Sequence, residues 1–81
     1  LDKYVGVYQF PNGDNLEIKK EKNQLVCYLL NKNKVQLLAN SEHNFYATFE
    51  FFKIYFNEEN GKTTGLRMEV YGKEFLLKKT N

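Results

Sequence analysis

Asparagine and glycine divide this sequence into short apolar segments, and that division constrains the fold more than any other feature. The chain has ten Asn and five Gly among 81 residues, and most of the Asn stand between apolar runs. Asn favours turns because its side chain bonds the nearby backbone and tolerates positive φ. No stretch shows a 3.6-residue hydrophobic period of useful length. The pattern therefore predicts short strands joined by tight turns.

The segments between the turns either alternate or are apolar throughout. In the first, Tyr4, Gly6, Tyr8 and Phe10 share one face, and Gly6 is expected in mid-strand where a bend or close backbone approach needs no Cβ. Turns are expected at residues 11–14, 57–62 and 72–73, with positive φ at Gly61 and Gly72. The expected strands are residues 4–10, 15–20, 24–30, 34–39, 45–49, 51–56, 65–71 and 74–79.

Strands at this spacing indicate an antiparallel meander. A flat sheet of about eight strands would leave one apolar face and two open edges, and closure removes both. We expect a single all-β domain over residues 1–81, an antiparallel meander in a lipocalin-like barrel that is closed or nearly closed. The residues expected to be mostly buried are Tyr4, Tyr8, Leu16, Ile18, Leu25, Ile54, Leu66, Met68 and Val70.

Composition narrows the function classes. The formal charge of +2 is too small to imply a nucleic-acid or membrane partner. No apolar run approaches the roughly 18 residues that cross a bilayer. The chain begins at Leu1 without a signal segment, so it is expected to be processed or excised from a longer protein. Cys27 is the only cysteine, which excludes an internal disulfide and a cysteine metal cage.

No residue pattern predicts catalysis or a cofactor. The only serine, Ser41, and the only histidine, His43, are two residues apart and flank Glu42 in an expected surface loop. Such close neighbours rarely form a nucleophile and base pair. Glu58 and Glu59 lack the spacing of a calcium loop, because Phe56 would be the first ligand. We therefore predict no catalytic residue, no metal site and no cofactor.

Aromatic and basic residues leave two binding hypotheses open beside a simple structural role. Tyr4, Tyr8, Phe10 and Tyr28 could line a barrel interior that takes a small apolar ligand, although a small barrel needs such side chains to fill its middle. Cys27 is expected to be a small buried hydrophobe. An OB-type nucleic-acid module is disfavoured because acidic residues are interspersed with the lysines. The lysines concerned are Lys19, Lys20, Lys22, Lys32, Lys34, Lys53, Lys78 and Lys79.

The order of short motifs along the chain is similar to a known family. Tyr4-x-Gly6-x-Tyr8 resembles the Tyr-x-Gly-x-Tyr start of a bacterial domain, and residues 57–66 resemble its Asn-rich, Gly-Lys, x-x-Gly-Leu hairpin. Leu16-x-Ile18 with Gln24-Leu25, then Val35-x-Leu37 with Ser41-Glu42-x-x-Phe45, follow in the same order. That domain of unknown function is found at the C-terminus of serine hydrolases of the β-lactamase and penicillin-binding type.

The resemblance implies a non-catalytic accessory barrel. It would pack beside a catalytic serine hydrolase domain in the same chain and shape substrate access, in the bacterial cell envelope or secreted. The catalytic Ser-x-x-Lys signature of those hydrolases is absent from this chain, since Ser41 is followed by Glu42, His43 and Asn44. The alternatives kept open are a barrel that binds a small apolar ligand, a nucleic-acid module and hydrolysis by this chain alone.

Overall fold

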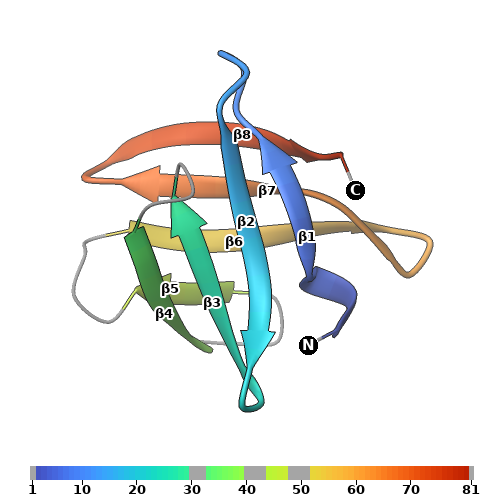
Figure 1. Cartoon of the computed structure of the whole chain (residues 1–81). Helices are drawn as coiled ribbons and strands as arrows, with labels where there is room; N and C mark the ends of the chain where they lie inside the picture. Colours follow the sequence, from blue (N-terminus) through green and yellow to red (C-terminus); the bar gives the residue numbers. More distant parts are fainter. Residues whose placement is uncertain (1, 30–32, 40–43, 48–51, 81) are drawn as a thin grey trace.

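The computed structural model describes residues 2–29, 33–39, 44–47 and 52–80, which form an all-β meander (Figure 1). A short 3-10 turn, η1 (Asp2–Tyr4), precedes the strands. The strands are β1 (Gly6–Gln9), β2 (Asn15–Glu21), β3 (Gln24–Leu29), β4 (Asn33–Ala39), β5 (Asn44–Ala47), β6 (Phe52–Glu59), β7 (Lys62–Val70) and β8 (Lys73–Lys79). Each strand pairs antiparallel with the next, and β1 with β8 closes the barrel. The fold class predicted from the sequence is confirmed.

The barrel is flattened into two crossing layers. In Figure 1 the axes of the antiparallel strands β1 to β4 are roughly aligned with one another, and β6 to β8 cross behind them. Side chains that alternate inward from both layers meet in one core. On β7, for example, Leu66 and Met68 are buried, whereas Arg67 and Glu69 between them lie on the outer face.

The core contains almost all of the residues expected there. Eight of the nine predicted positions are buried, and the exception is Val70, which is only half-buried. Val70 is the last residue of β7 and packs against the margin of the core, where the barrel ends. The complete buried cluster is Tyr4, Tyr8, Leu16, Ile18, Leu25, Cys27, Val35, Leu37, Ile54, Phe56, Leu66, Met68 and Leu77.

The start of the chain corrects the first predicted strand. Tyr4 lies in η1 and not in a strand, and β1 begins at Gly6. Gly6 therefore stands at the strand's first position and not in its middle, with φ of 156°. Glycine adopts this φ without the steric cost that a side chain would add. The change of direction lets Tyr4 enter the end of the barrel.

The hairpin turns are tighter than the sequence suggested. β6 and β7 continue as a two-stranded ribbon to Asn60 and Gly61, so the predicted loop over residues 57–62 is wrong at both ends. Asn60 and Gly61 have φ of 52° and 79°, and the expected positive φ at Gly61 is confirmed. The β7–β8 turn is formed by Tyr71 and Gly72, one residue earlier than predicted. Gly72 has the expected positive φ of 83°.

Candidate functional site

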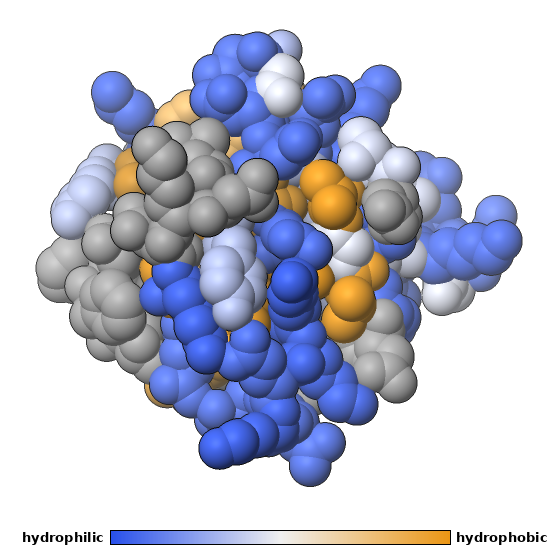
Figure 2. All heavy atoms as spheres, viewed as in Figure 1, coloured by the Kyte–Doolittle hydropathy of each residue, from blue (hydrophilic) through white to orange (hydrophobic). Residues whose placement is uncertain are grey.

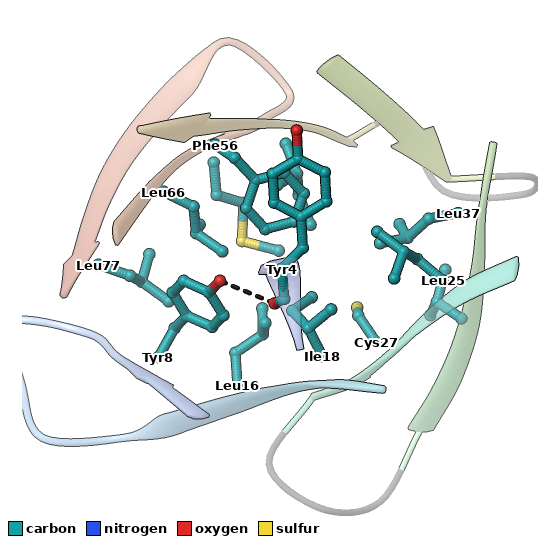
Figure 3. Close-up of a cluster of buried hydrophobic side chains, with 13 residues drawn as sticks. Tyr4, Tyr8, Leu16, Ile18, Leu25, Cys27, Leu37, Phe56, Leu66 and Leu77 are labelled. Atoms are coloured by element: carbon teal, nitrogen blue, oxygen red, sulfur yellow. Dashed lines mark hydrogen bonds between the residues drawn. The ribbon is translucent and has the colours of Figure 1, made fainter. Parts of the chain in front are cut away.

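One end of the barrel is closed by Tyr4. Its ring stacks on Phe56 with ring centroids 4.2 Å apart, and its backbone carbonyl accepts a 2.8 Å hydrogen bond from the buried Tyr8 hydroxyl. Figure 3 shows Tyr4 among the core side chains, with this bond drawn as a dashed line. Lys3 Nζ lies 3.0 Å from Glu58 Oε2, which joins η1 to the β6–β7 ribbon. The N-terminal turn is thus a fixed plug.

Tyr8 and Cys27, two titratable groups in the described core, are held in their neutral forms. Burial, with a smaller contribution from nearby Tyr4, raises the pKa of Tyr8 far above the usual phenol value. Burial also raises the pKa of the Cys27 thiol to about 12. A thiol protonated at neutral pH is a poor nucleophile. Tyr8 and Cys27 are therefore packing groups, as expected for Cys27.

The opposite end of the barrel has an apolar margin that is only partly covered. Phe10, Leu29 and Val70 pack against the core but remain half-exposed. Phe75 is 37% exposed and meets Phe10 edge-on, with ring centroids 5.9 Å apart. We call these four residues the apolar mouth. Of the predicted ligand-lining residues, the structure brings Tyr4 and Tyr8 into the interior and places Phe10 at this mouth.

Tyr28, the fourth predicted interior residue, lies on the outer face, so that placement is wrong. It pairs with Glu17 opposite, and its hydroxyl donates a 2.8 Å hydrogen bond to Glu21 Oε2. Glu21 is paired with Gln24, so the Tyr28 ring extends back along β3 past Val26. This explains why Val26, also on the outer face, is only 3% exposed.

Charged groups hold the Tyr28 ring in place. Lys34 Nζ lies 2.5 Å from Glu21 Oε1, and Lys19 Nζ lies 5.4 Å from the ring centroid. Hydrogen bonds from Lys34 and then from Tyr28 lower the pKa of Glu21, and the bond to Glu21 raises the pKa of Tyr28. Lys19 and Lys34 are therefore paired with acids, not arranged as a continuous positive stripe. Figure 2 shows this side of the barrel as mainly hydrophilic.

A second outer surface carries exposed apolar side chains. Tyr71 is 72% exposed, Leu76 is 64% exposed and Phe75 is 37% exposed, and all three belong to the β7–β8 hairpin. Tyr55, Arg67 and Leu76 form one cross-strand row. Phe75 faces the barrel side of β8 with Met68 and belongs to the apolar mouth, so we call Tyr71 and Leu76 the hairpin surface.

Arg67, the only arginine of the chain, anchors this row. Its guanidinium lies 4.1 Å from the Tyr55 ring centroid and 2.8 Å from Glu69 Oε2, and it also reaches Glu74 at 3.4 Å. Aromatic and arginine side chains of this kind are enriched in protein interfaces. These contacts fix the Arg67 side chain beside the exposed Leu76, so the hairpin surface combines an apolar side chain with a held charge.

Sequence reasoning did not find the hairpin surface, although a signal was present. Strand residues alternate between faces, so the adjacent Leu76 and Leu77 point to opposite faces and only one of them can enter the barrel core. Leu77 pairs with Leu66 inside the barrel, which leaves Leu76 outside beside Arg67. Two adjacent leucines in an alternating strand thus indicate one outward apolar residue.

Several expected features lie elsewhere or outside the described residues. Ser41, Glu42 and His43 are not described, and neither is Lys32. Glu58 and Glu59 belong to the β6–β7 ribbon, where Glu59 pairs with Lys62. Among residues 2–29, 33–39, 44–47 and 52–80, no group of three His, Cys, Asp or Glu side chains could hold a metal ion. The same residues include no helix long and apolar enough to cross a membrane.

Fold and site together define a small closed β-barrel whose described core is filled by side chains. Among the residues whose burial is described, the large apolar side chains that are most exposed belong to the β7–β8 hairpin. The chain belongs to the family described as domain of unknown function (DUF3471), which matches residues 1–81. No curated protein and no solved structure matches the sequence significantly.

Proposed function

We propose that this chain is a non-catalytic, lipocalin-like accessory domain that packs beside a serine hydrolase domain of the β-lactamase type in the same polypeptide and shapes substrate access. The observation that carries the proposal is the hairpin surface. Leu76 is mostly exposed beside an arginine that is already fixed by Tyr55 and Glu69, and Tyr71 is mostly exposed in the turn of the same hairpin. The nature of the partner rests on the resemblance of the motif order to hydrolase-associated domains.

The composition of the hairpin surface favours a protein partner. Tyrosine and arginine carry much of the binding energy in interfaces, because they offer large contact area together with a polar group. Tyr71 occupies a turn position with φ of 49°, which is uncommon for a bulky residue. Such strained positions are often found at functional sites. A turn that presents an exposed aromatic ring in this way supports a role in contact.

The filled interior supports a surface role over an internal one. The middle and one end of the barrel are occupied by Tyr4, Tyr8 and Phe56. The Tyr8 hydroxyl donates its hydrogen bond to the Tyr4 backbone carbonyl. The buried thiol and phenol remain protonated at neutral pH. The described interior therefore offers packing groups and no activated group.

The test uses the complete polypeptide that contains this chain. Leu76→Lys should loosen the domain from its neighbour and raise KM of the hydrolase severalfold with little change in kcat, because access and not chemistry is altered. Val5→Lys is the matched control, since Val5 is also exposed but lies before β1. Limited proteolysis of the intact protein reports whether the domain is docked.

Two results would overturn the proposal. One is a coding sequence with no Ser-x-x-Lys domain in the same chain. The other is ester or amide hydrolysis by the purified 81-residue chain that is lost on changing Ser41 or His43 to alanine. Equal kinetics and equal proteolysis for Leu76→Lys and Val5→Lys would remove the hairpin surface as the docking site.

A second candidate function is favoured by the apolar mouth. Phe10, Leu29, Val70 and Phe75 are half-exposed at the end of the core, and barrel mouths are common ligand sites. A small apolar ligand would bind there and not beside Tyr4, where the end is plugged. Native-state fluorescence of an anilinonaphthalene dye, compared between the natural chain and Phe75→Ser, tests this candidate. No dye binding by the folded natural chain would exclude it.

A further inference from the structure

The sequence contains two Asn-Gly pairs, Asn12-Gly13 and Asn60-Gly61, and both lie in exposed turns. An asparagine that precedes glycine can react with its own backbone, because the glycine nitrogen can attack the side-chain amide carbon and glycine has no side chain to hinder the approach. The structure places the two pairs in different surroundings. The same dipeptide should therefore differ in reactivity between its two positions in the folded chain.

Asn12-Gly13 is held by the hydrogen bonds of the β1–β2 loop. The Gly13 N–H donates to the Phe10 carbonyl at 2.9 Å, so the attacking nitrogen is already engaged. The Asn12 side chain is also fixed, since its Oδ1 accepts from the Asp14 N–H at 2.9 Å and its Nδ2 donates to Asp14 Oδ2 at 3.1 Å. The Phe10 N–H closes the loop by donating to the Asp14 carbonyl at 2.8 Å. Reaction at Asn12 therefore requires several of these bonds to open.

Asn60-Gly61 forms the two-residue turn at the end of the β6–β7 ribbon. Glu59 pairs with Lys62 across it, and both turn residues have positive φ. The hydrogen bonds of a two-residue turn join the residues on either side of it, so the Gly61 N–H is not one of their donors. Figure 1 shows this turn projecting past β1 and the N-terminal turn. The nitrogen that would attack Asn60 thus faces water and is not held by the turn.

The ribbon that carries this turn is weakly supported. β5 pairs with β6 only as far as Tyr55, and β8 pairs with β7 only back to Gly65. Residues 58–64 therefore have no third strand beside them in the described part of the chain. The Thr63 hydroxyl is buried without a hydrogen-bond partner among the described residues, which lowers the stability of the ribbon further. Two-stranded ribbons are marginally stable, so this end of the barrel should open locally at little cost.

We propose that Asn60 is a self-modification site, at which the side-chain amide is lost to give aspartate and isoaspartate, whereas the β1–β2 loop protects Asn12. The Gly61 nitrogen gives its proton to water and forms a bond to Asn60 Cγ. The Cγ–Nδ2 bond breaks, and Nδ2 takes a proton from water and leaves as ammonia. Water then adds to either carbonyl of the resulting succinimide ring and opens it. No group is oxidised or reduced, and water is the co-reactant.

The two products differ in their effect on the ribbon. Aspartate keeps the backbone and adds a negative charge beside Glu59. Isoaspartate passes the main chain through its Cβ, so the turn gains a backbone atom, no longer fits a two-residue connection and should lose the pairing of Glu59 with Lys62. Glu58 lies next in the ribbon, and its Oε2 is 3.0 Å from Lys3 Nζ and accepts from the Tyr4 hydroxyl at 3.4 Å. The isoaspartate form should therefore also loosen the N-terminal turn.

The test incubates the folded chain and the urea-unfolded chain side by side in mildly alkaline buffer. Peptide mapping by mass spectrometry measures the loss of each amide, and an isoaspartyl methyltransferase measures isoaspartate. In the folded chain Asn60 should react at least about tenfold faster than Asn12, because at least two hydrogen bonds must open at Asn12 before attack. In urea the loop bonds are absent, so the two rates should agree within about threefold.

The matched control for the isoaspartate form is freshly purified Asn60→Asp, which adds the charge without the extra backbone atom. Hydrogen exchange of the Glu59 and Lys62 amides should be about fivefold faster or more in the isoaspartate form, as expected for the loss of an ordinary hydrogen bond, and nearly unchanged in Asn60→Asp. Reaction at Asn12 as fast as at Asn60 in the folded chain, or the same ratio of rates in urea, would overturn the proposed site. An isoaspartate form that exchanges like Asn60→Asp would overturn its effect on the ribbon.

Discussion

Gly65 supports the sharpest stability prediction, because its backbone lies against β8. A Cβ built at Gly65 would stand 2.4 Å from the Leu77 carbonyl oxygen, where ordinary contacts begin near 3.4 Å. The atom in the way is backbone and not the end of a flexible side chain. Gly65→Ala therefore requires β7 and β8 to move apart by up to about 1 Å, at the upper end of the usual overpacking cost of about 1–3 kcal/mol.

Alanine also lowers the conformational entropy of the unfolded chain, which offsets about 0.4–1 kcal/mol of the overpacking cost. We expect a net loss of about 2 kcal/mol in the free energy of unfolding. In a domain of this size that lowers Tm by roughly 8–16 °C, because each kcal/mol corresponds to about 4–8 °C. Thermal unfolding followed by circular dichroism measures the change, and urea unfolding gives the free energy independently.

Gly72→Asn is the matched control. Gly72 has φ of 83°, and a Cβ at this position would meet nothing within 4 Å, so its requirement is conformational and not steric. Asn tolerates positive φ, and its cost should stay below about 1 kcal/mol. A Gly65→Ala variant with the Tm of the natural chain, or one no less stable than Gly72→Asn, would refute the reasoning.

Three further predictions concern the interior and the outer cluster. Tyr8→Phe removes the buried hydrogen bond from the Tyr8 hydroxyl to the Tyr4 carbonyl, so it should lower the free energy of unfolding in urea by about 1 kcal/mol. An unchanged midpoint would show that this bond contributes nothing. Folding raises the pKa values of Cys27 and Tyr8. Their contribution to the free energy of unfolding is therefore complete below the pKa values of the unfolded chain, about 8.5 and 10, and declines as pH rises above those values. Stability should therefore fall from about pH 8.5, less steeply in Cys27→Ala, and thiol labelling should require unfolding; rapid labelling of the native chain would contradict this. Tyr28→Phe removes one of two donors to Glu21 and should raise the pKa of that carboxyl, measured by NMR, while Lys34 still holds it below the usual value; no change would show that the phenol does not bond the carboxylate.

The sequence predicted the meander because its turns have a local cause. Asn60-Gly61 and Gly72 require positive φ, and the alternation at Leu66 and Met68 identifies a buried face without tertiary information. Tyr4 was harder to place, since the alternation of residues 4–10 continues through a 3-10 turn. Only the stacking of Tyr4 on Phe56, far along the chain, distinguishes a plug from a strand residue.

The misplacement of Tyr28 has a specific physical cause. β3 is apolar on both faces, so its pattern does not say which face is inside. The register does: the two-residue turn at Lys22 and Asn23 pairs Glu21 with Gln24, which sets Tyr28 opposite Glu17. Leu16 and Ile18 face inward, so Glu17 and Tyr28 must face outward. A three-residue turn would have reversed this assignment.

The close approach at Gly65 and the short β1–β8 pairing could not be predicted from one sequence. Both depend on how far the strands are offset when the barrel closes, and that offset is fixed by contacts between distant segments. The exposed Leu76 marks the hairpin surface locally, but whether β1 covers the adjacent backbone depends on where β1 ends. The loop bonds at Phe10 decide that point.

The seam between β1 and β8 also shapes how the barrel folds. Every other strand pairing joins neighbours in the chain, so its loop-closure entropy is small, whereas Tyr8 and Lys79 lie at opposite ends of the sequence. Beside the Tyr8–Lys79 pair, the Thr80 N–H donates to the Val7 carbonyl at 2.8 Å. The β1–β8 pairing should therefore form last during folding and open first in the native state. Hydrogen exchange of the Val7 and Thr80 amides would detect this local opening before the amides of the core exchange.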